Sequence, residues 1–210
     1  MIRWGIIGLG NMANKFATSI QEVDNAKLIS ISSQSKEKLD IFKKKFNIEQ
    51  KYSFNTYEDL IRCDEVDAVY ISTLNNTHLN LIKKCAENNK NILCEKPIGL
   101  NYNEAKIAKE YILQNKILFF EAIAYRTHPQ IEILKNLIEQ DEVGEIISIN
   151  SSFGFKVKKI KPESRLFNKK LGGGAILDIG CYPVSVLTLF SKLKIFDLKN
   201  SIGSFTGTGV

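Results

Sequence analysis

The segment IRWGIIGLGNMA, residues 2–13, decides the fold of the N-terminal part of this 210-residue chain. An apolar run typical of a strand leads into a G-x-G-x-x-A motif at residues 8–13, and a helical pattern follows. In such a turn Gly8 permits the tight bend, Gly10 has no side chain to obstruct a pyrophosphate, and Ala13 lets the helix lie close to the strand. The start of the helix offers free amides and a partial positive charge to phosphates. The segment therefore predicts a dinucleotide-binding site, although a glycine turn that only packs a helix has the same pattern.

Beyond this segment, strand-like and helix-like runs alternate as far as about residue 125. The runs expected as strands are 2–10 (with its turn), 26–33, 66–73, 91–97 and 116–125, and those expected as helices are 11–23, 35–46, 78–89 and 103–115. Strict alternation predicts parallel strands joined by right-handed crossovers. The strands are continuously apolar, as expected when helices cover both faces of a sheet. We predict the α/β class, with a Rossmann doubly wound parallel sheet in residues 1–122.

The pattern changes in residues 123–210, where we predict a second domain. A helix is expected at 128–144, a strand with partial period-two alternation at 145–155, and a glycine turn leading into an apolar helix at 171–193. Another strand is expected at 195–210. Two strands do not form an independently stable layer, so this domain is predicted to be a partial, apparently truncated α+β unit.

Composition limits the class of protein. Net charge is +6 and the pI is near 9.0, which permits acidic ligands such as phosphates, but the lysines are scattered and no nucleic-acid partner is expected. We find no apolar run as long as a membrane span and no signal peptide, so no membrane partner is expected. Four cysteines without CxxC spacing indicate reduced thiols and a cytoplasmic protein, and no cluster of metal ligands occurs.

The end of the second expected strand bears on the choice of cofactor. An NAD site usually has an acid there to bind the ribose hydroxyls, whereas residues 32–36 are SSQSK. Ser33 and Gln34, with a nearby lysine, could surround a 2′-phosphate that a carboxylate would repel. The segment favours NADP and leaves NAD open, because serine and lysine also begin helices for local reasons.

The segment ILCEKPIG, residues 92–99, ends a strand-like run with an acid, a base and a proline. In doubly wound sheets, ligands bind beyond the C-terminal ends of the strands. Lys96 could polarise a substrate oxygen there, with Glu95 beside it, and Pro97 fixes the backbone, with a cis peptide among the options. A surface ion pair of little consequence is the alternative.

The segment LGGGAILDIGCYPVSV, residues 171–186, contributes a second pair of polar residues. Asp178 and Tyr182 are four apart, which places them on one face of an α-helix. Tyrosine titrates near pH 10, and a nearby cationic lysine would lower that pKa and make Tyr182 a proton carrier. Asp178 could orient the substrate hydroxyl or the tyrosine. A capping acid and a half-buried tyrosine are the alternative.

Four stretches in this order give the chain a family resemblance: GIIGLGNMA, YISTLNNTHLNLIKKCAENNKNILCEKPIGLN, FFEAIAYRTHPQ and RLFNKKLGGGAILDIGCYPVS. They resemble the glucose–fructose oxidoreductase, inositol dehydrogenase and MocA family across essentially the whole chain, in particular its branch of dihydrodiol and D-xylose dehydrogenases. The resemblance implies a Rossmann domain and a C-terminal domain with a mainly antiparallel sheet. It also implies hydride transfer between a nicotinamide cofactor and a sugar, cyclitol or vicinal diol.

The resemblance also implies roles for individual residues. Lys96 is expected near the nicotinamide and the reacting hydroxyl, Tyr182 as the general acid/base, and Asp178 as the acid one helical turn earlier. Arg126 matches an arginine at the domain junction, and His128, beside Pro129, is expected only to pack. The cofactor-binding residues expected from the motifs and the resemblance together are Gly8, Leu9, Gly10, Asn11, Met12, Ser33, Gln34, Leu74, Asn75, His78, Glu95 and Lys96.

The sequence is compatible with two functions. The first is an NAD(P)-dependent dehydrogenase in which the Lys96 amine and the Tyr182 phenol meet at one carbinol. The second is a truncated, non-catalytic dinucleotide-binding protein, because family members continue past the final residues GSFTGTGV. A homodimer or higher oligomer is expected only if the full C-terminal sheet is present.

Overall fold

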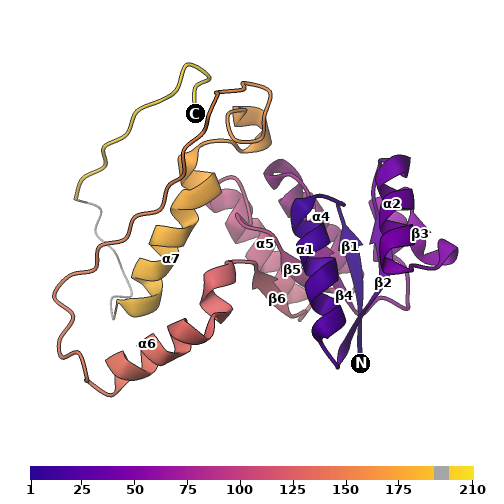
Figure 1. Cartoon of the computed structure of the whole chain (residues 1–210), viewed down its shortest axis with the longest axis horizontal. Helices are drawn as coiled ribbons and strands as arrows, with labels where there is room; N and C mark the ends of the chain where they lie inside the picture. Colours follow the sequence, from indigo (N-terminus) through magenta and orange to yellow (C-terminus); the bar gives the residue numbers. More distant parts are fainter. Residues whose placement is uncertain (192–198) are drawn as a thin grey trace. The chain divides into compact units, whose positions relative to one another are not determined.

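The computed structural model describes residues 1–191 and 199–210, which form two compact units, Met1–Ala122 and Ile123–Val210 (Figure 1). The first unit contains a six-stranded sheet in the order β3-β2-β1-β4-β5-β6. Its strands are β1 (Ile2–Ile7), β2 (Ala26–Ser32), β3 (Ser53–Phe54), β4 (Ala68–Ile71), β5 (Asn91–Cys94) and β6 (Phe119–Glu121). All five pairings are parallel, and the chain changes direction across the sheet at β1, which pairs with both β2 and β4. The predicted doubly wound sheet is confirmed.

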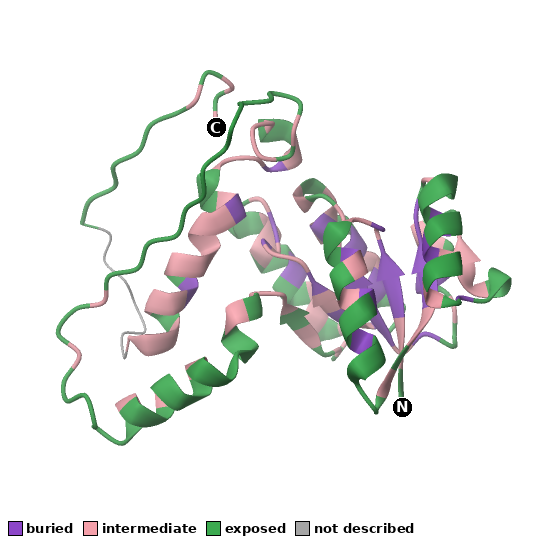
Figure 2. Cartoon of the chain, viewed as in Figure 1, coloured by how far each residue is buried: buried purple, intermediate pink, exposed green. Residues whose placement is uncertain are grey.

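Helices of the first unit cover both faces of this sheet (Figure 1). They are α1 (Asn11–Ser19), α2 (Lys36–Phe46), α3 (Tyr57–Ile61), α4 (His78–Glu87) and α5 (Tyr102–Gln114). Residues of α1 and α2 share one buried cluster with Ile6, and residues of α3, α4 and α5 share another with Ile7. Neighbouring residues of β1 enter opposite clusters because side chains alternate across a strand. Figure 2 shows this burial concentrated in the sheet and the inner faces of the helices.

Local chemistry explains where these helices begin. The side chains of Ser35, Thr56 and Asn101 each accept a hydrogen bond from a backbone N–H in the first turn of α2, α3 and α5. Such caps satisfy amides that have no partner within the helix. The sequence analysis missed β3 and α3, because two and five residues are too short to produce a recognisable period.

The second unit is helical in its described residues. Its helices are α6 (Pro129–Glu139), a π-helical turn (Ile176–Gly180) and α7 (Cys181–Phe190), with short 3-10 turns at Ala124–Thr127 and Lys169–Leu171. The helix predicted at 128–144 is confirmed but ends at Glu139. The apolar helix after the glycine turn is also confirmed as far as the described residues extend.

Two strands were predicted in the second unit, at residues 145–155 and 195–210. Residues 145–155 form no strand, so that prediction is wrong. The predicted strand 195–210 lies partly outside the described residues, and its described part, 199–210, contains no strand either. A strand exists only through hydrogen bonds to a neighbouring strand, and the described residues of this unit supply none to pair with. The mainly antiparallel sheet expected for this unit is therefore not observed in residues 123–191 and 199–210.

One helical run bears on the expectation that no segment could span a membrane. Among the described residues, the run Lys169–Phe190 has 22 residues and is long and apolar enough to cross a membrane, by length and composition alone. The sequence predicted an apolar helix at 171–193, over most of this run, but no run of spanning length; in the structure the run joins a 3-10 turn, a π-helical turn and α7. One such helix is weak evidence of a membrane span, since the core helix of a soluble protein passes the same test.

Candidate active site

The glycine turn lies at the C-terminal end of β1, where the strand order reverses. Gly8 has φ +88°, and its N–H donates to the Ser32 carbonyl oxygen at 3.0 Å. A Cβ on Gly8 would lie 2.7 Å from Cγ2 of Thr73, so both the backbone angle and the space require glycine here. The turn is therefore fixed between β2 and the loop that follows β4.

Gly10 is the N-cap residue of α1, and a Cβ added to it would meet no atom within 4 Å. The first turn of α1 has no acidic residue and no side-chain cap, so its amides are available to an anion. Open space in front of free amides is what a pyrophosphate needs, so these residues fit the phosphates of a dinucleotide. Met12 is 44% exposed and Asn11 is exposed, whereas the Leu9 side chain is in the core and only its main chain can face a ligand.

The end of β2 has no carboxylate in residues 32–36. Ser33 is buried, and its hydroxyl accepts a hydrogen bond from the Ser35 N–H at 3.1 Å. Ser35 in turn caps α2 through the Lys38 N–H. Gln34 is exposed beside them. The segment thus presents hydroxyls, an amide and a helix start, but its serines also have the local capping role that the sequence left open.

The loop after β4 is attached directly to the glycine turn. Ser72 donates its hydroxyl to the Gly8 carbonyl oxygen at 2.7 Å, and its N–H to the Ile7 carbonyl oxygen at 2.9 Å. Leu74 is 41% exposed, and Asn75, which is half-buried, begins a short 3-10 turn that leads into α4. These contacts place the loop that contains Leu74 and Asn75 next to the predicted phosphate site.

His78, the first residue of α4, is fully buried. Its Nδ1 lies 2.8 Å from the Pro97 carbonyl oxygen, and its Nε2 lies 3.4 Å from the Thr73 carbonyl oxygen. Burial lowers the pKa of His78, so the ring is neutral at pH 7 and can donate only one N–H. The shorter contact assigns that donor to Nδ1. His78 thereby joins the loop after β4 to the Glu-Lys-Pro segment from the interior.

The Glu-Lys-Pro segment follows β5 at the same edge of the sheet. The Glu95 N–H donates to the Ile71 carbonyl oxygen at 2.9 Å, and its carboxylate accepts the Tyr70 hydroxyl. The Lys96–Pro97 peptide bond is cis, and Lys96 is half-buried. Beyond it, the Ile98 N–H donates to Oε1 of Glu121, at the end of β6, at 2.8 Å. The Glu-Lys-Pro segment at the end of β5 is thereby attached to the ends of β4 and β6.

Asp178 and Tyr182 belong to the second unit. Asp178 is 7% exposed, and its carboxylate accepts a 2.7 Å hydrogen bond from Nη1 of Arg165. It lies in the π-helical turn, whereas Tyr182 lies in the first turn of α7. A π-helical turn bonds residue i to i+5, so the four-residue spacing does not fix both side chains on one face as it would in an α-helix. Arg165 was missed by the sequence analysis because it lies in an irregular loop.

Tyr182 lies beside two aromatic rings of the second unit, those of Phe153 and Tyr125. Phe153 meets its ring edge-on at a centroid distance of 5.1 Å, and Tyr125 lies at 6.3 Å. The Tyr125 hydroxyl donates to Oγ of Ser185 at 2.8 Å, which attaches the start of this unit to α7. Two aromatic rings of this unit therefore lie beside Tyr182.

Two other predicted residues lie near the start of the second unit. Arg126 is exposed in the 3-10 turn Ala124–Thr127. His128 was expected only to pack beside Pro129, but it is exposed, and its Nδ1 accepts a hydrogen bond from the Gln130 N–H at 3.1 Å. It is the N-cap of α6, a role that a polar side chain before Pro at the first helical position fills readily.

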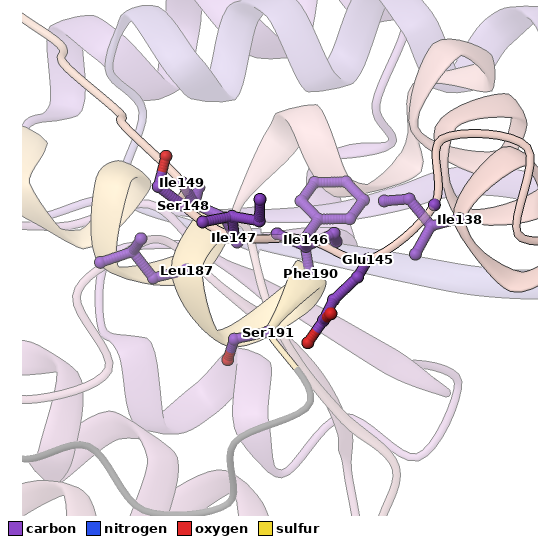
Figure 3. Close-up of a pocket in the computed structure, with 10 residues that line it drawn as sticks. Ile138, Glu145, Ile146, Ile147, Ser148, Ile149, Leu187, Phe190 and Ser191 are labelled. Atoms are coloured by element: carbon purple, nitrogen blue, oxygen red, sulfur yellow. The ribbon is translucent and has the colours of Figure 1, made fainter.

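A cavity of about 480 Å³ occurs elsewhere in the second unit. Figure 3 shows the residues that line it, which come from α6, from α7 and the residue after it, and from a segment at the start of the predicted strand region: Ile138, residues 144–149, Leu187, Phe190 and Ser191. None of the predicted catalytic residues lines it. Within residues 1–191 and 199–210, no group of three or more His, Cys, Asp or Glu side chains could hold a metal ion.

Comparison with known proteins agrees with this geometry. Residues 2–122 match the model of an oxidoreductase family with an NAD-binding Rossmann fold, and residues 131–204 match the GFO/IDH/MocA C-terminal domain. Trans-1,2-dihydrobenzene-1,2-diol dehydrogenase of Xenopus tropicalis is 30% identical over 89% of the chain and 56% of that protein. D-xylose 1-dehydrogenase (NADP(+)) 2 of Haloferax volcanii is 28% identical over 89% and 56%.

Among solved structures, scyllo-inositol dehydrogenase from Lactobacillus casei, with bound NAD(H) and scyllo-inositol, is 28% identical. It has a TM-score of 0.65 over 69% of this chain and 43% of its own. The chain thus spans just over half the length of the two curated relatives named above. The family model covers more than half of the chain. The glycine turn of this chain lies at the reversal point of the sheet. This protein therefore belongs to the Gfo/Idh/MocA oxidoreductase family and has its NAD(P)-binding Rossmann domain.

Proposed function

We propose that this protein is an NAD(P)-dependent oxidoreductase that transfers hydride between a nicotinamide cofactor and a sugar, cyclitol or vicinal-diol alcohol, or the corresponding carbonyl. The observation that carries the proposal is that the glycine turn, at the reversal point of the parallel sheet, and the Glu-Lys-Pro segment after β5 lie at the same edge of that sheet. The loop after β4 contacts the glycine turn, and His78 joins that loop to the Glu-Lys-Pro segment. Ligands of doubly wound proteins bind at that point. The relatives named above act on a diol, a sugar and a cyclitol, which supports this class of substrate.

For the cofactor we propose NADP, with NAD as the alternative. The absence of a carboxylate in residues 32–36 removes the group that would repel a 2′-phosphate, and Ser33 and Gln34 lie at the end of β2. The pyrophosphate would lie on the main chain of residues 8–12, in the open space in front of Gly10. Leu74, Asn75 and Glu95, on the neighbouring strand ends, would contact the rest of the cofactor.

When bound, the nicotinamide ring supplies or accepts the hydride at its C4 atom. In the oxidation direction, Lys96 would polarise the substrate oxygen and favour the developing alkoxide by its positive charge. In oxidation Tyr182, as the phenolate, would accept the hydroxyl proton and then release it to solvent from the phenol. In reduction the phenol would give its proton to the substrate oxygen and take one up again from solvent. Asp178, which Arg165 holds at 2.7 Å, would orient the substrate hydroxyl or the tyrosine.

We further propose that residues 1–122 form the cofactor domain and residues 123–210 the first part of the substrate and dimerisation domain, in a cytoplasmic protein. The partner would be a small polyol or sugar, without nucleic acid or membrane. A homodimer or larger oligomer is proposed for a protein that includes a complete C-terminal sheet.

Titration of purified protein with NADPH and NADH, followed by a screen of polyols and aldoses for hydride transfer, tests this function. We expect saturable binding with NADPH tighter than NADH, and turnover with at least one polyol or its carbonyl product. Failure to bind either cofactor would contradict the proposal.

The second candidate is a non-catalytic dinucleotide-binding protein. It is favoured by residues 145–155, which form no strand although the pattern predicts one, whereas the family resemblance implies a sheet in the substrate domain. Cofactor binding without hydride transfer in the same screen would select this candidate.

A further inference from the structure

We propose that Tyr70 is a positioning residue of the cofactor site, because it holds the carboxylate of Glu95 and supports the helix of the glycine turn at the same time. This inference rests on the proposed cofactor site and adds a residue to it. Tyr70 lies within β4 and is 2% exposed, so its side chain is not accessible to a bound ligand.

The first half of the link is a hydrogen bond along the sheet. The Tyr70 hydroxyl donates to Oε1 of Glu95 at 2.5 Å. In the β4–β5 pairing Tyr70 is opposite Leu93, so the phenol reaches two residues further toward the C-terminal edge. Together with the bond from the Glu95 N–H to Ile71, it fixes both the main chain and the side chain of the residue before Lys96.

The chemistry of the two groups fixes which of them donates this hydrogen bond. A carboxylate can only accept, so the phenol is the donor. Burial and the adjacent carboxylate of Glu95 raise the pKa of Tyr70 far above its ordinary value. Tyr70 therefore stays protonated wherever the protein is folded and keeps its donor. Hydrogen bonds to an ionised acceptor are about twice as strong as neutral ones, which suits a positioning role.

The second half of the link is an aromatic stack. The Tyr70 ring stacks on Phe16 of α1 at a centroid distance of 4.3 Å and an interplanar angle of 28°, and Phe16 meets Trp4 edge-on at 5.3 Å. Because α1 begins at Gly10, the ring that holds Glu95 also supports the helix whose amides face the phosphates. A phenylalanine would fill the same space and keep the stack. It would lack the hydroxyl through which the Tyr70 side chain reaches Glu95 at the edge of the sheet.

The test compares Tyr70→Phe with Tyr111→Phe, which removes a phenol from α5, where Lys83 lies over the ring. We expect Tyr70→Phe to fold, to weaken NADPH binding about tenfold, as expected for a lost hydrogen bond to a charged acceptor, and to speed amide hydrogen exchange in residues 94–98. Tyr111→Phe should change neither. A purely structural tyrosine would lower the melting temperature and leave the dissociation constant unchanged.

A double-mutant cycle with Glu95→Ala decides whether Tyr70 acts through Glu95. The hydroxyl should have no further effect on NADPH binding once the carboxylate is absent. If Tyr70→Phe binds NADPH like the wild type, or still weakens binding in the Glu95→Ala background, the positioning role is overturned while the proposed function stands. If the wild type binds neither NADPH nor NADH, the proposed function fails and this inference fails with it.

Discussion

The imidazole of His78 and the carbonyl oxygen of Pro97 lie 2.8 Å apart in the interior of the first unit. Nineteen positions separate these residues in the chain, yet the contact joins the start of α4 to the Glu-Lys-Pro segment. The histidine was predicted to bind the cofactor. In the structure its ring is fully buried and contacts the carbonyl oxygen of Pro97, the residue after Lys96.

His78 should make folding stability depend on pH. Burial lowers its pKa, so below about pH 6.5 the unfolded chain takes up a proton that the folded chain resists. The contribution of His78 to the free energy of unfolding should therefore be complete above about pH 6.5. As the pH drops below that value, the free energy of unfolding should decrease by up to about 1.4 kcal/mol per pH unit because of this group. Urea unfolding of the wild type and His78→Gln at pH 7.5 and 5.5 measures the effect.

Glutamine can still donate to Pro97 but does not titrate, so the variant should lose less stability than the wild type between the two pH values. His128→Gln removes the other of the two histidines and serves as the control. Equal losses in the wild type and His78→Gln would contradict the assignment.

Substitution by alanine should affect folding stability at Gly8 and cofactor affinity at Gly10. Gly8→Ala forces a Cβ to 2.7 Å from Thr73 at φ +88°, which should cost about 1–2 kcal/mol for the backbone alone and more for the contact. Gly10→Ala meets no atom within 4 Å and should fold normally, but its methyl group enters the space proposed for the pyrophosphate. Thermal unfolding and NADPH titration of both variants separate the two effects. Normal NADPH affinity in Gly10→Ala would remove the proposed phosphate position.

The ion pair of Arg3 and Asp67 should stabilise the first unit at neutral pH and fail in acid. Nε and Nη2 of Arg3 reach the two carboxylate oxygens at 3.0 and 2.6 Å, and this pairing lowers the pKa of Asp67 to about 2. Its contribution is thus complete above about pH 3.8 and is lost as the pH falls toward 2. Both side chains are more than a third exposed, so solvent reduces the effect.

Asp67→Asn should lower the melting temperature by a few degrees at pH 7, with the difference shrinking as the pH falls from 4 to 2. Calorimetry over this range measures it. A difference that stayed constant with pH would show that the carboxylate charge is not the cause.

Lys96→Ala and Tyr182→Phe should separate chemistry from cofactor binding. Lys96→Ala should reduce kcat by about two to three orders of magnitude, as expected for loss of electrostatic stabilisation at the reacting oxygen, about 2.7–4 kcal/mol. Tyr182→Phe should reduce kcat and change its pH profile, because the proton carrier is gone. NADPH dissociation constants should stay within a few-fold of the wild type in Tyr182→Phe. Undiminished turnover in Lys96→Ala, or an unchanged pH profile in Tyr182→Phe, would falsify the mechanism.

The sequence alone determined the parallel sheet and its glycine turn. These features rest on local information: apolar runs of strand length, amphipathic runs of helix length, and glycines at positions where a side chain would collide. The positive φ of Gly8 and the open space at Gly10 match what residues 8–13 predicted. The same local patterns failed where elements were short, as in β3 and α3, or interrupted, as in the π-helical turn before α7.

Only the tertiary structure decided which distant residues support the edge of the sheet. The bond from Tyr70 to Glu95 spans 25 positions and that from His78 to Pro97 spans 19, and neither follows from a period in the chain. Residues 145–155 have the alternating pattern of a strand but form no strand. A strand needs a neighbouring strand to pair with, and its own sequence does not determine whether one is present. Periodicity fixes which face of an element is apolar, whereas hydrogen bonds between elements depend on which elements become neighbours.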